Sequence, residues 1–364
     1  MHAPGDAGRN RRNMAIDVVR GYCIILMVSS HVAAESWVNQ VLHFLRFVSG
    51  AEGFVFLAGF VVGMVYRRKI ETGSRAKAYV ALLRRARLLY VTHCLMVLAI
   101  VGPNGLVWRY ADLPKPVDMG WAMFVWLTLS LQLQPGHMMN ILPLYVILLG
   151  AAPLAFELMR RRMSLVLLAA SSALFVWTQY QPGALSLVHE SSGGDAFPVV
   201  AWQFLFVLGM CGGYHVRWMR NRFVAPHRTT WRWGMGLACV ALIIAVNVQV
   251  PGFEFYDHVR WDATLWERHP LRAGRVGYFL ISIGAIYLAA QAATRYSLLV
   301  RPLRAMALMG RNSLYCFLTH IVLAFPLVAL LGVAPRLYEV APPIAVAVVY
   351  QLAKRQVGRP WIPN

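Results

Sequence analysis

The sequence predicts an all-α fold: a polytopic integral membrane bundle of about ten transmembrane helices, with both termini cytoplasmic. Hydrophobic residues make up 59% of the 364 residues, and charged residues make up only 14%. The mean hydropathy is +0.53, which is typical of a membrane protein and not of a soluble one. The apolar segments are also long enough to cross a bilayer, and short basic clusters separate them.

The whole chain, residues 1–364, is expected to form a single transmembrane domain. No stretch has the composition of a soluble domain, and no low-complexity segment or inverted repeat is evident. Residues 1–13 are polar and basic, as in a cytoplasmic tail. They do not resemble a cleaved signal, because the apolar segment that follows is full length and carries charges. Residues 14–353 form the predicted bundle, and residues 354–364 form a second cytoplasmic tail.

Taken in order, ten apolar segments have the composition of membrane-spanning helices. A further apolar stretch, residues 120–133, is short and rich in tryptophan. Hydropathy alone is compatible with three arrangements of this stretch: it crosses the membrane, lies at the interface or re-enters. The ten predicted spans cover residues 14–35, 51–66, 85–102, 139–158, 163–178, 199–216, 233–250, 276–293, 309–332 and 339–353.

The distribution of basic residues predicts the orientation of these spans. If residues 120–133 do not cross, the segments on the side of the termini hold 25 Lys and Arg, and the opposite side holds eight. Because basic loops are retained in the cytoplasm, both termini are expected there. If residues 120–133 crossed, Arg160 to Arg162 would move outside and every later loop would invert. We therefore expect this stretch not to cross.

The net charge of +20 does not indicate a nucleic-acid partner, because the basic residues lie in short loops between apolar segments. The same charge can help to hold an anionic ligand at the cytoplasmic face. The five cysteines lie inside apolar segments without the spacing of a zinc site, and the histidines are scattered. No metal site is therefore predicted. The expected surroundings are membrane lipids, and the sequence leaves homo-oligomer formation open.

The first span carries three polar side chains that lipid would reject: Asp17, Arg20 and His31. His31 lies eleven positions after Arg20, which is three helical turns plus about 20°, with about 16 Å of rise. Asp17 lies three residues before Arg20 and therefore on the same side of the helix. The three side chains form one stripe, with the charged pair near the cytoplasmic face and the imidazole near the outer face.

Each residue of this stripe has a structural and a functional interpretation. His31 is either a core histidine bonded to a carbonyl or a general base that takes a proton from a hydroxyl group; its alignment with the other two favours the base. Asp17 and Arg20 are either a buried ion pair or a device that orients an anionic donor. Glu52, at the outer end of the second span, is either an interfacial carboxylate or a group that orients His31 or an acceptor hydroxyl.

Two further spans carry residues of interest. The ninth span contains Arg311 and, nine positions later, His320. His320 should lie near mid-membrane, either as a functional residue or as a hydrogen-bonded structural residue. The second span contains small residues at spacings that let a neighbouring helix or a ligand come close. These are Gly50, Gly53, Gly59 and Gly63.

Several segments in order carry a resemblance to a known family. Asp17 to Gly21 reads DxxRG, and Arg20 is followed by ten residues and then His31. The later segments are GFVFLAGFVVG (53–63), QPGHMMNILPLY (134–145), WQFLFVLG (202–209) and GRNSLYCFLTH (310–320). Together they resemble the OpgC-type branch of the membrane acyltransferase 3 superfamily. The chain departs from the branch at Ala58, where serine is common, and at Asn140, where aspartate is frequent.

The resemblance implies ten spans in a bacterial inner membrane, a cytoplasmic acyl-coenzyme A donor and a periplasmic glycan acceptor. It implies transfer of an acyl group, succinyl or acetyl, to a hydroxyl of a periplasmic glucan or another exported glycan. His31 would be the general base, assisted by Asp17, Arg20 and Glu52. The residues expected to hold the donor are Arg20, Arg84, Arg85, Arg311 and His320, and those expected to hold the acceptor are Glu52, Asn140, Trp202 and Gln203.

The main alternative is a transporter or flippase for an anionic or glycan substrate, in which the buried charges mark a permeation route. It predicts movement of the substrate without an acyl donor and without covalent change. The lack of an evident inverted repeat argues against it. A scaffold that has lost its activity is disfavoured, because each buried polar residue lowers stability.

Overall fold

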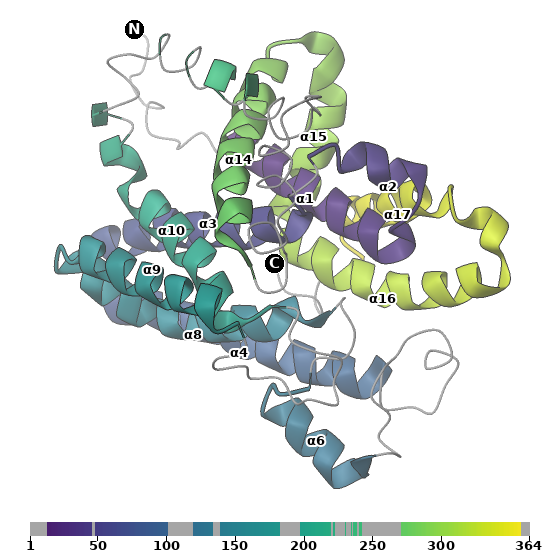
Figure 1. Cartoon of the computed structure of the whole chain (residues 1–364), viewed down its shortest axis with the longest axis horizontal. Helices are drawn as coiled ribbons and strands as arrows, with labels where there is room; N and C mark the ends of the chain where they lie inside the picture. The colour runs from purple at the N-terminus through teal and green to yellow at the C-terminus, as the bar shows by residue number, and fades with distance from the viewer. Residues whose placement is uncertain are drawn as a thin grey trace, which may run out of the picture.

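The computed structural model describes residues 13–45, 48–100, 119–133, 139–182, 197–219 and 271–357. It also describes the short pieces 221–222, 230, 234, 236–238 and 240–241. Within these ranges every regular element is helical (Figure 1). The predicted all-α class is therefore confirmed for the described part of the chain. Most of the predicted span 233–250 and most of both predicted tails lie outside it.

The helices fall into two groups that lie against each other (Figure 1). One group holds α3 (Gly50–Thr72), α4 (Arg75–Ile100), α6 (Trp121–Leu129), α8 (Ile141–Arg160), α9 (Ser164–Tyr180) and α10 (Val199–Met219). The other holds α1 (Met14–Ala33), α2 (Trp37–Leu42), α14 (Ala273–Ala293), α15 (Ser297–Arg311), α16 (Ser313–Val333), the 3₁₀ turn η4 (Pro335–Leu337) and α17 (Ala341–Arg355). Contacts of α3 with α1 and α14 join the two groups.

Six helices of the described residues are long and apolar enough to cross a membrane: α1, α3, α8, α10, α14 and most of α16. Helix α9 is apolar but shorter. Helix α4 covers residues 85–100 of the predicted span 85–102 but also carries basic residues, and α17 has 15 residues. The structure thus supports a membrane protein with several spans, while the count of ten and the position of the termini stay predictions.

Glycines of α3 and α10 allow these two helices to pack backbone to backbone. A Cβ atom on Gly59 would clash with the carbonyl oxygen of Phe206, and one on Gly63 would clash with that of Met210. The paired positions advance together along both helices, so α3 and α10 run in the same direction. The predicted close approach at the small residues of α3 is confirmed, and α10 is the neighbouring helix.

Helix α1 lies at the centre of the second group, where it contacts α2, α3, α14, α15, α16 and α17. Its tightest contact is with α15. A Cβ on Gly21 would meet the carbonyl of Met306, and one on Gly310 would meet the carbonyl of Asp17. The main chains at Asp17 and Gly310 are thus in contact, which fixes the first polar residue of the α1 stripe against α15.

The structure corrects two sequence predictions in this region. Residues 294–308 were expected to form a loop, but residues 297–311 form α15, which packs on α1. Residues 309–332 were expected to form one helix, but the chain breaks at Asn312, with φ −103° and ψ 33°. The Asn312 side chain donates to the carbonyl of Leu308 at 3.0 Å, a local bond that competes with regular helix geometry. Hydropathy does not register a break of one residue.

Helix α6 has nine residues, about 14 Å in length, which is too short to cross a bilayer. This agrees with the prediction that residues 120–133 do not cross.

Candidate functional site

His31 and His320 form a contacting pair between α1 and α16. His31 Nδ1 lies 2.9 Å from His320 Nε2, although 289 positions separate the two residues. The rings are stacked, with centroids 5.1 Å apart and an angle of 17° between their planes. His320 is buried, with 1% of its surface exposed. A hydrogen bond at this distance needs a proton on one nitrogen and a lone pair on the other, so the tautomer of one ring determines that of the other.

A cavity of about 440 Å³ lies where the two helix groups meet. Its polar wall contains three guanidinium groups, those of Arg20, Arg85 and Arg311. Asn312, Ser313 and Tyr145 complete the polar lining, and the rest is apolar: Phe54, Ala58, Val61, Val62, Leu89, Leu142, Leu149, Leu314 and Phe317. A cavity with a cationic part and an apolar part suits a ligand with an anionic group and an apolar segment.

The break at Asn312 brings the ends of α15 and α16 to the α1 stripe. Arg311 Nε lies 3.2 Å from Asp17 Oδ2, and Arg20 donates to the hydroxyl of Ser313. Asp17 is buried, whereas half of the Arg311 side chain is exposed. Asp17 is thus held by Arg311, and Arg20 reaches both Ser313 and the cavity. The ion pair between Asp17 and Arg20, one of the two interpretations of these residues, stays a prediction.

Two aromatic rings connect the cavity with the histidine pair. Phe54 and Phe317 both line the cavity and stack with centroids 5.6 Å apart. Phe317 also packs edge-on against His320, at 5.1 Å between centroids. The arginine-lined cavity and the two imidazoles are therefore neighbouring parts of one region, with a single ring layer between them.

Glu52 takes part in a different interaction from the one expected. It is fully buried, its Oε1 lies 2.5 Å from Arg275 Nε, and its Oε2 accepts from the Ser49 backbone at 2.9 Å. Arg275 was expected at the end of an outer loop, but α14 begins at Ala273 and buries this arginine. Glu52 thus caps its own helix and ties α3 to α14. Its predicted roles toward His31 and the acceptor stay predictions.

The other predicted site residues lie apart from the cavity lining. Arg84 is exposed on α4, one position from Arg85. Trp202 is fully buried against Phe197, and Gln203 exchanges hydrogen bonds with the side chain and carbonyl of Ser171 on α9. Asn140 precedes α8, and its buried side-chain oxygen has no hydrogen-bond partner in the structure. The suggested role of Arg84 in donor binding and those of Asn140, Trp202 and Gln203 in acceptor binding remain predictions.

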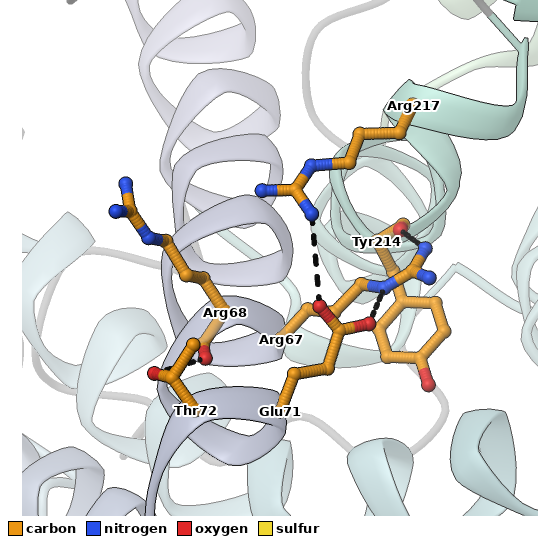
Figure 2. Close-up of polar contacts among 6 residues, drawn as sticks. All are labelled: Arg67, Arg68, Glu71, Thr72, Tyr214 and Arg217. Carbon is orange, nitrogen blue, oxygen red and sulfur yellow. Dashed lines mark hydrogen bonds and ion pairs between the residues drawn. The ribbon is translucent and has the colours of Figure 1, made fainter. Parts of the chain in front are cut away.

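The arginines at the end of α3 form contacts within the protein (Figure 2). Arg67 pairs with Glu71 at 2.6 Å and donates to the carbonyl of Tyr214, whose ring it also covers. Arg217 approaches the same carboxylate at 3.9 Å, while Arg68 points away from these contacts (Figure 2). Arg67 therefore joins α3 to α10, in contrast to Arg85, which lines the cavity.

Sequence reasoning gave no role to three residues of this region: Tyr145, Arg275 and Ser313. Tyr145 ends the segment QPGHMMNILPLY and Ser313 lies in GRNSLYCFLTH, so both residues belong to segments that carry the family resemblance. That position is the signal in the sequence that points to them. Within the described residues, no group of three or more His, Cys, Asp or Glu could hold a metal ion.

Comparison with known protein families shows which family this chain belongs to. The family model described as OpgC protein matches residues 12–354, which is nearly the whole chain. The chain belongs to the OpgC family. No curated protein and no solved structure matches it. Membership implies a membrane acyltransferase that acts on glucans, and the apolar helices agree with a membrane location. The predicted family resemblance is confirmed.

Proposed function

We propose that this OpgC protein is a bacterial inner-membrane O-acyltransferase that uses acyl-coenzyme A from the cytoplasm. The acyl group, succinyl in our proposal, is transferred to a hydroxyl of a periplasmic glucan or another exported glycan. The observation that carries the proposal is the contact between His31 and the buried His320 beside an arginine-lined cavity. An acyl transfer to an alcohol needs a base and a site for an anionic donor, and this region offers both.

His31 acts as the general base in this reaction. Its imidazole takes the proton of the glycan hydroxyl while the hydroxyl oxygen attacks the thioester carbonyl and forms a carbon–oxygen bond. The tetrahedral intermediate then collapses, the carbon–sulfur bond breaks, and the coenzyme leaves as a thiolate that receives the proton from the imidazolium. The products are the glycan ester and free coenzyme A. No oxidant, metal or covalent enzyme intermediate is needed.

His320 is a positioning residue for His31. When His31 Nδ1–H donates to His320 Nε2, the lone pair of His31 lies on Nε2, which becomes the basic nitrogen. The stacked rings hold that nitrogen in one direction. This replaces our expectation that His320 binds the donor.

The cavity holds the anionic donor. Arg20 and Arg85 supply positive charge without a carboxylate among the lining residues, and Arg311 remains half exposed at its pair with Asp17. Guanidinium groups bind carboxylates and phosphates through paired hydrogen bonds. The acyl chain extends from this wall toward Phe54 and Phe317, behind which His320 and His31 lie.

Transfer from radiolabelled acyl-coenzyme A to a glucan by the purified protein tests the proposal. His31→Ala is expected to reduce the rate about 10²–10⁴-fold, because a general base contributes by that factor. His320→Leu should lose more activity than His320→Gln, since glutamine still offers an acceptor to His31.

His215→Ala is the matched control, because His215 is bonded to Ser164 at 2.8 Å and does not line the cavity. It should keep its activity. Full transfer by a folded His31→Ala variant would overturn the role of His31. Movement of a glycan without any ester formation would replace the acyltransferase with a transporter.

A further inference from the structure

Tyr145 carries a buried hydroxyl that the structure leaves without a partner. The residue lies in the second turn of α8 and is 6% exposed. Its ring packs edge-on against Phe54, at 5.5 Å between centroids, and lines the arginine cavity. The hydroxyl oxygen is buried and makes no hydrogen bond. Because the Tyr145 side chain lines the cavity, an occupant of the cavity is the candidate partner for this hydroxyl.

Such a hydroxyl lowers the stability of the empty protein. Burial removes its hydrogen bonds to water, and no protein group replaces them. Another buried tyrosine of the same bundle shows the usual arrangement: Tyr315 is 3% exposed and donates to the carbonyl of Val357 at 2.6 Å. Buried tyrosines normally find a partner in this way, and Tyr145 is an exception at the wall of a cavity.

The electrostatic surroundings indicate the kind of partner. The positive charges of Arg20 and Arg85 act on the Tyr145 hydroxyl, and both arginines line the same cavity. The lining combines this neutral hydroxyl with three guanidinium groups, those of Arg20, Arg85 and Arg311, and contains no carboxylate. An occupant that accepts from the hydroxyl and from Arg20 and Arg85 must offer acceptor oxygens with negative charge, as a carboxylate or a phosphate does.

We infer that the Tyr145 hydroxyl is a ligand-binding group that donates a hydrogen bond to an anionic oxygen held by Arg20 and Arg85. The inference rests on the proposed function, which places the acyl donor in this cavity. Two parts of that donor carry such oxygens: the free carboxylate of a dicarboxylic acyl group, and the phosphates of the coenzyme. Tyr145 thus contributes to recognition of the acyl donor. Its hydroxyl lowers the stability of the empty protein and raises the affinity for the donor.

The experiment compares Tyr145→Phe with Tyr315→Phe, which is the same deletion of one hydroxyl oxygen at two buried sites. Without ligand, Tyr145→Phe is expected to unfold at the same or a higher temperature than the wild type, because it removes an unsatisfied group. Tyr315→Phe is expected to unfold at a lower temperature, because it removes a formed bond. If the Tyr145 hydroxyl had a merely structural role, Tyr145→Phe would lower the unfolding temperature as Tyr315→Phe does.

Binding of coenzyme A, acetyl-coenzyme A and succinyl-coenzyme A is then measured by calorimetry, with Arg20→Ala as a comparison. Tyr145→Phe is expected to raise the dissociation constant about tenfold or more, as for a hydrogen bond to a charged group. A loss confined to succinyl-coenzyme A supports the inference and identifies the carboxylate as the partner. An equal loss for all three supports it and identifies a phosphate.

Tyr315→Phe should bind each compound as the wild type does. The inference is overturned if Tyr145→Phe binds all three compounds with wild-type affinity while Arg20→Ala does not, and the proposed function then stands. If the folded wild type binds none of the three compounds, the proposed function fails, and the inference fails with it.

Discussion

At the scale of single residues, the buried charged groups meet partners that are remote in sequence. Asp17 is held by Arg311, and Glu52 is held by Arg275, from which 223 positions separate it. A charge buried in an apolar bundle needs such a partner, because desolvation otherwise makes it very unfavourable. The sequence placed Asp17 within a span and Glu52 at the outer end of one, but it could not show that Arg311 and Arg275 lie beside them.

The Glu52–Arg275 pair yields a prediction about stability. Glu52→Gln is expected to destabilise the protein by about 3–5 kcal/mol, because it leaves the charge of Arg275 buried without its carboxylate. Chemical unfolding in detergent, followed by the fluorescence of the tryptophans, measures this change.

The double variant Glu52→Gln, Arg275→Gln is the control. Since it removes both charges, it should lose clearly less stability than the sum of the two single variants. Strict additivity of the two single effects would show that the two side chains do not stabilise each other.

At the scale of elements, close helix contacts at glycines set the arrangement of the bundle. Four glycines of α3 and α10 replace side chains where the two backbones meet: Gly59, Gly63, Gly209 and Gly213. Van der Waals contact between main chains is the main attraction between helices when lipid removes the hydrophobic driving force. The spacing in α3 was visible in the sequence, but its partner helix was not.

Gly59→Ala tests this contact. The new methyl group would meet the carbonyl of Phe206, which belongs to a helix backbone and cannot move aside alone. We expect a loss of about 1–3 kcal/mol, the usual effect of overpacking, measured as a lower unfolding temperature in detergent.

Gly150→Ala in α8 is the matched control, because nothing lies within 4 Å of the position of its Cβ. It should leave the unfolding temperature unchanged or slightly higher, since alanine favours a helix. Equal effects of the two substitutions would contradict the role assigned to the α3–α10 contact.

At the scale of the whole molecule, the basic residues predict how the chain lies in the membrane. The 25 Lys and Arg on one side against eight on the other favour both termini in the cytoplasm. This orientation would bring the arginine end of the α1 stripe to the cytoplasmic donor and His31 toward the acceptor.

Reporter fusions measure this orientation. A green fluorescent protein at the C-terminus should fluoresce, because it folds in the cytoplasm. Alkaline phosphatase at the same position should be inactive. Phosphatase inserted between residues 183 and 196, a predicted outer loop, should be active. Active phosphatase at the C-terminus would refute the predicted orientation and require an odd number of crossings or an inverted bundle.

The sequence by itself determined the all-helical membrane class, the family and the polar stripe of α1. These follow from local quantities: hydropathy along a segment, the helical repeat, and motifs in order. Only the tertiary structure decided that His31 meets His320, that Asn312 ends a helix, and that Tyr145 faces an arginine cavity. The physical reason is that these contacts join segments far apart in the chain. Which segments meet is set by the packing of helix faces, and no property of either segment alone contains that information.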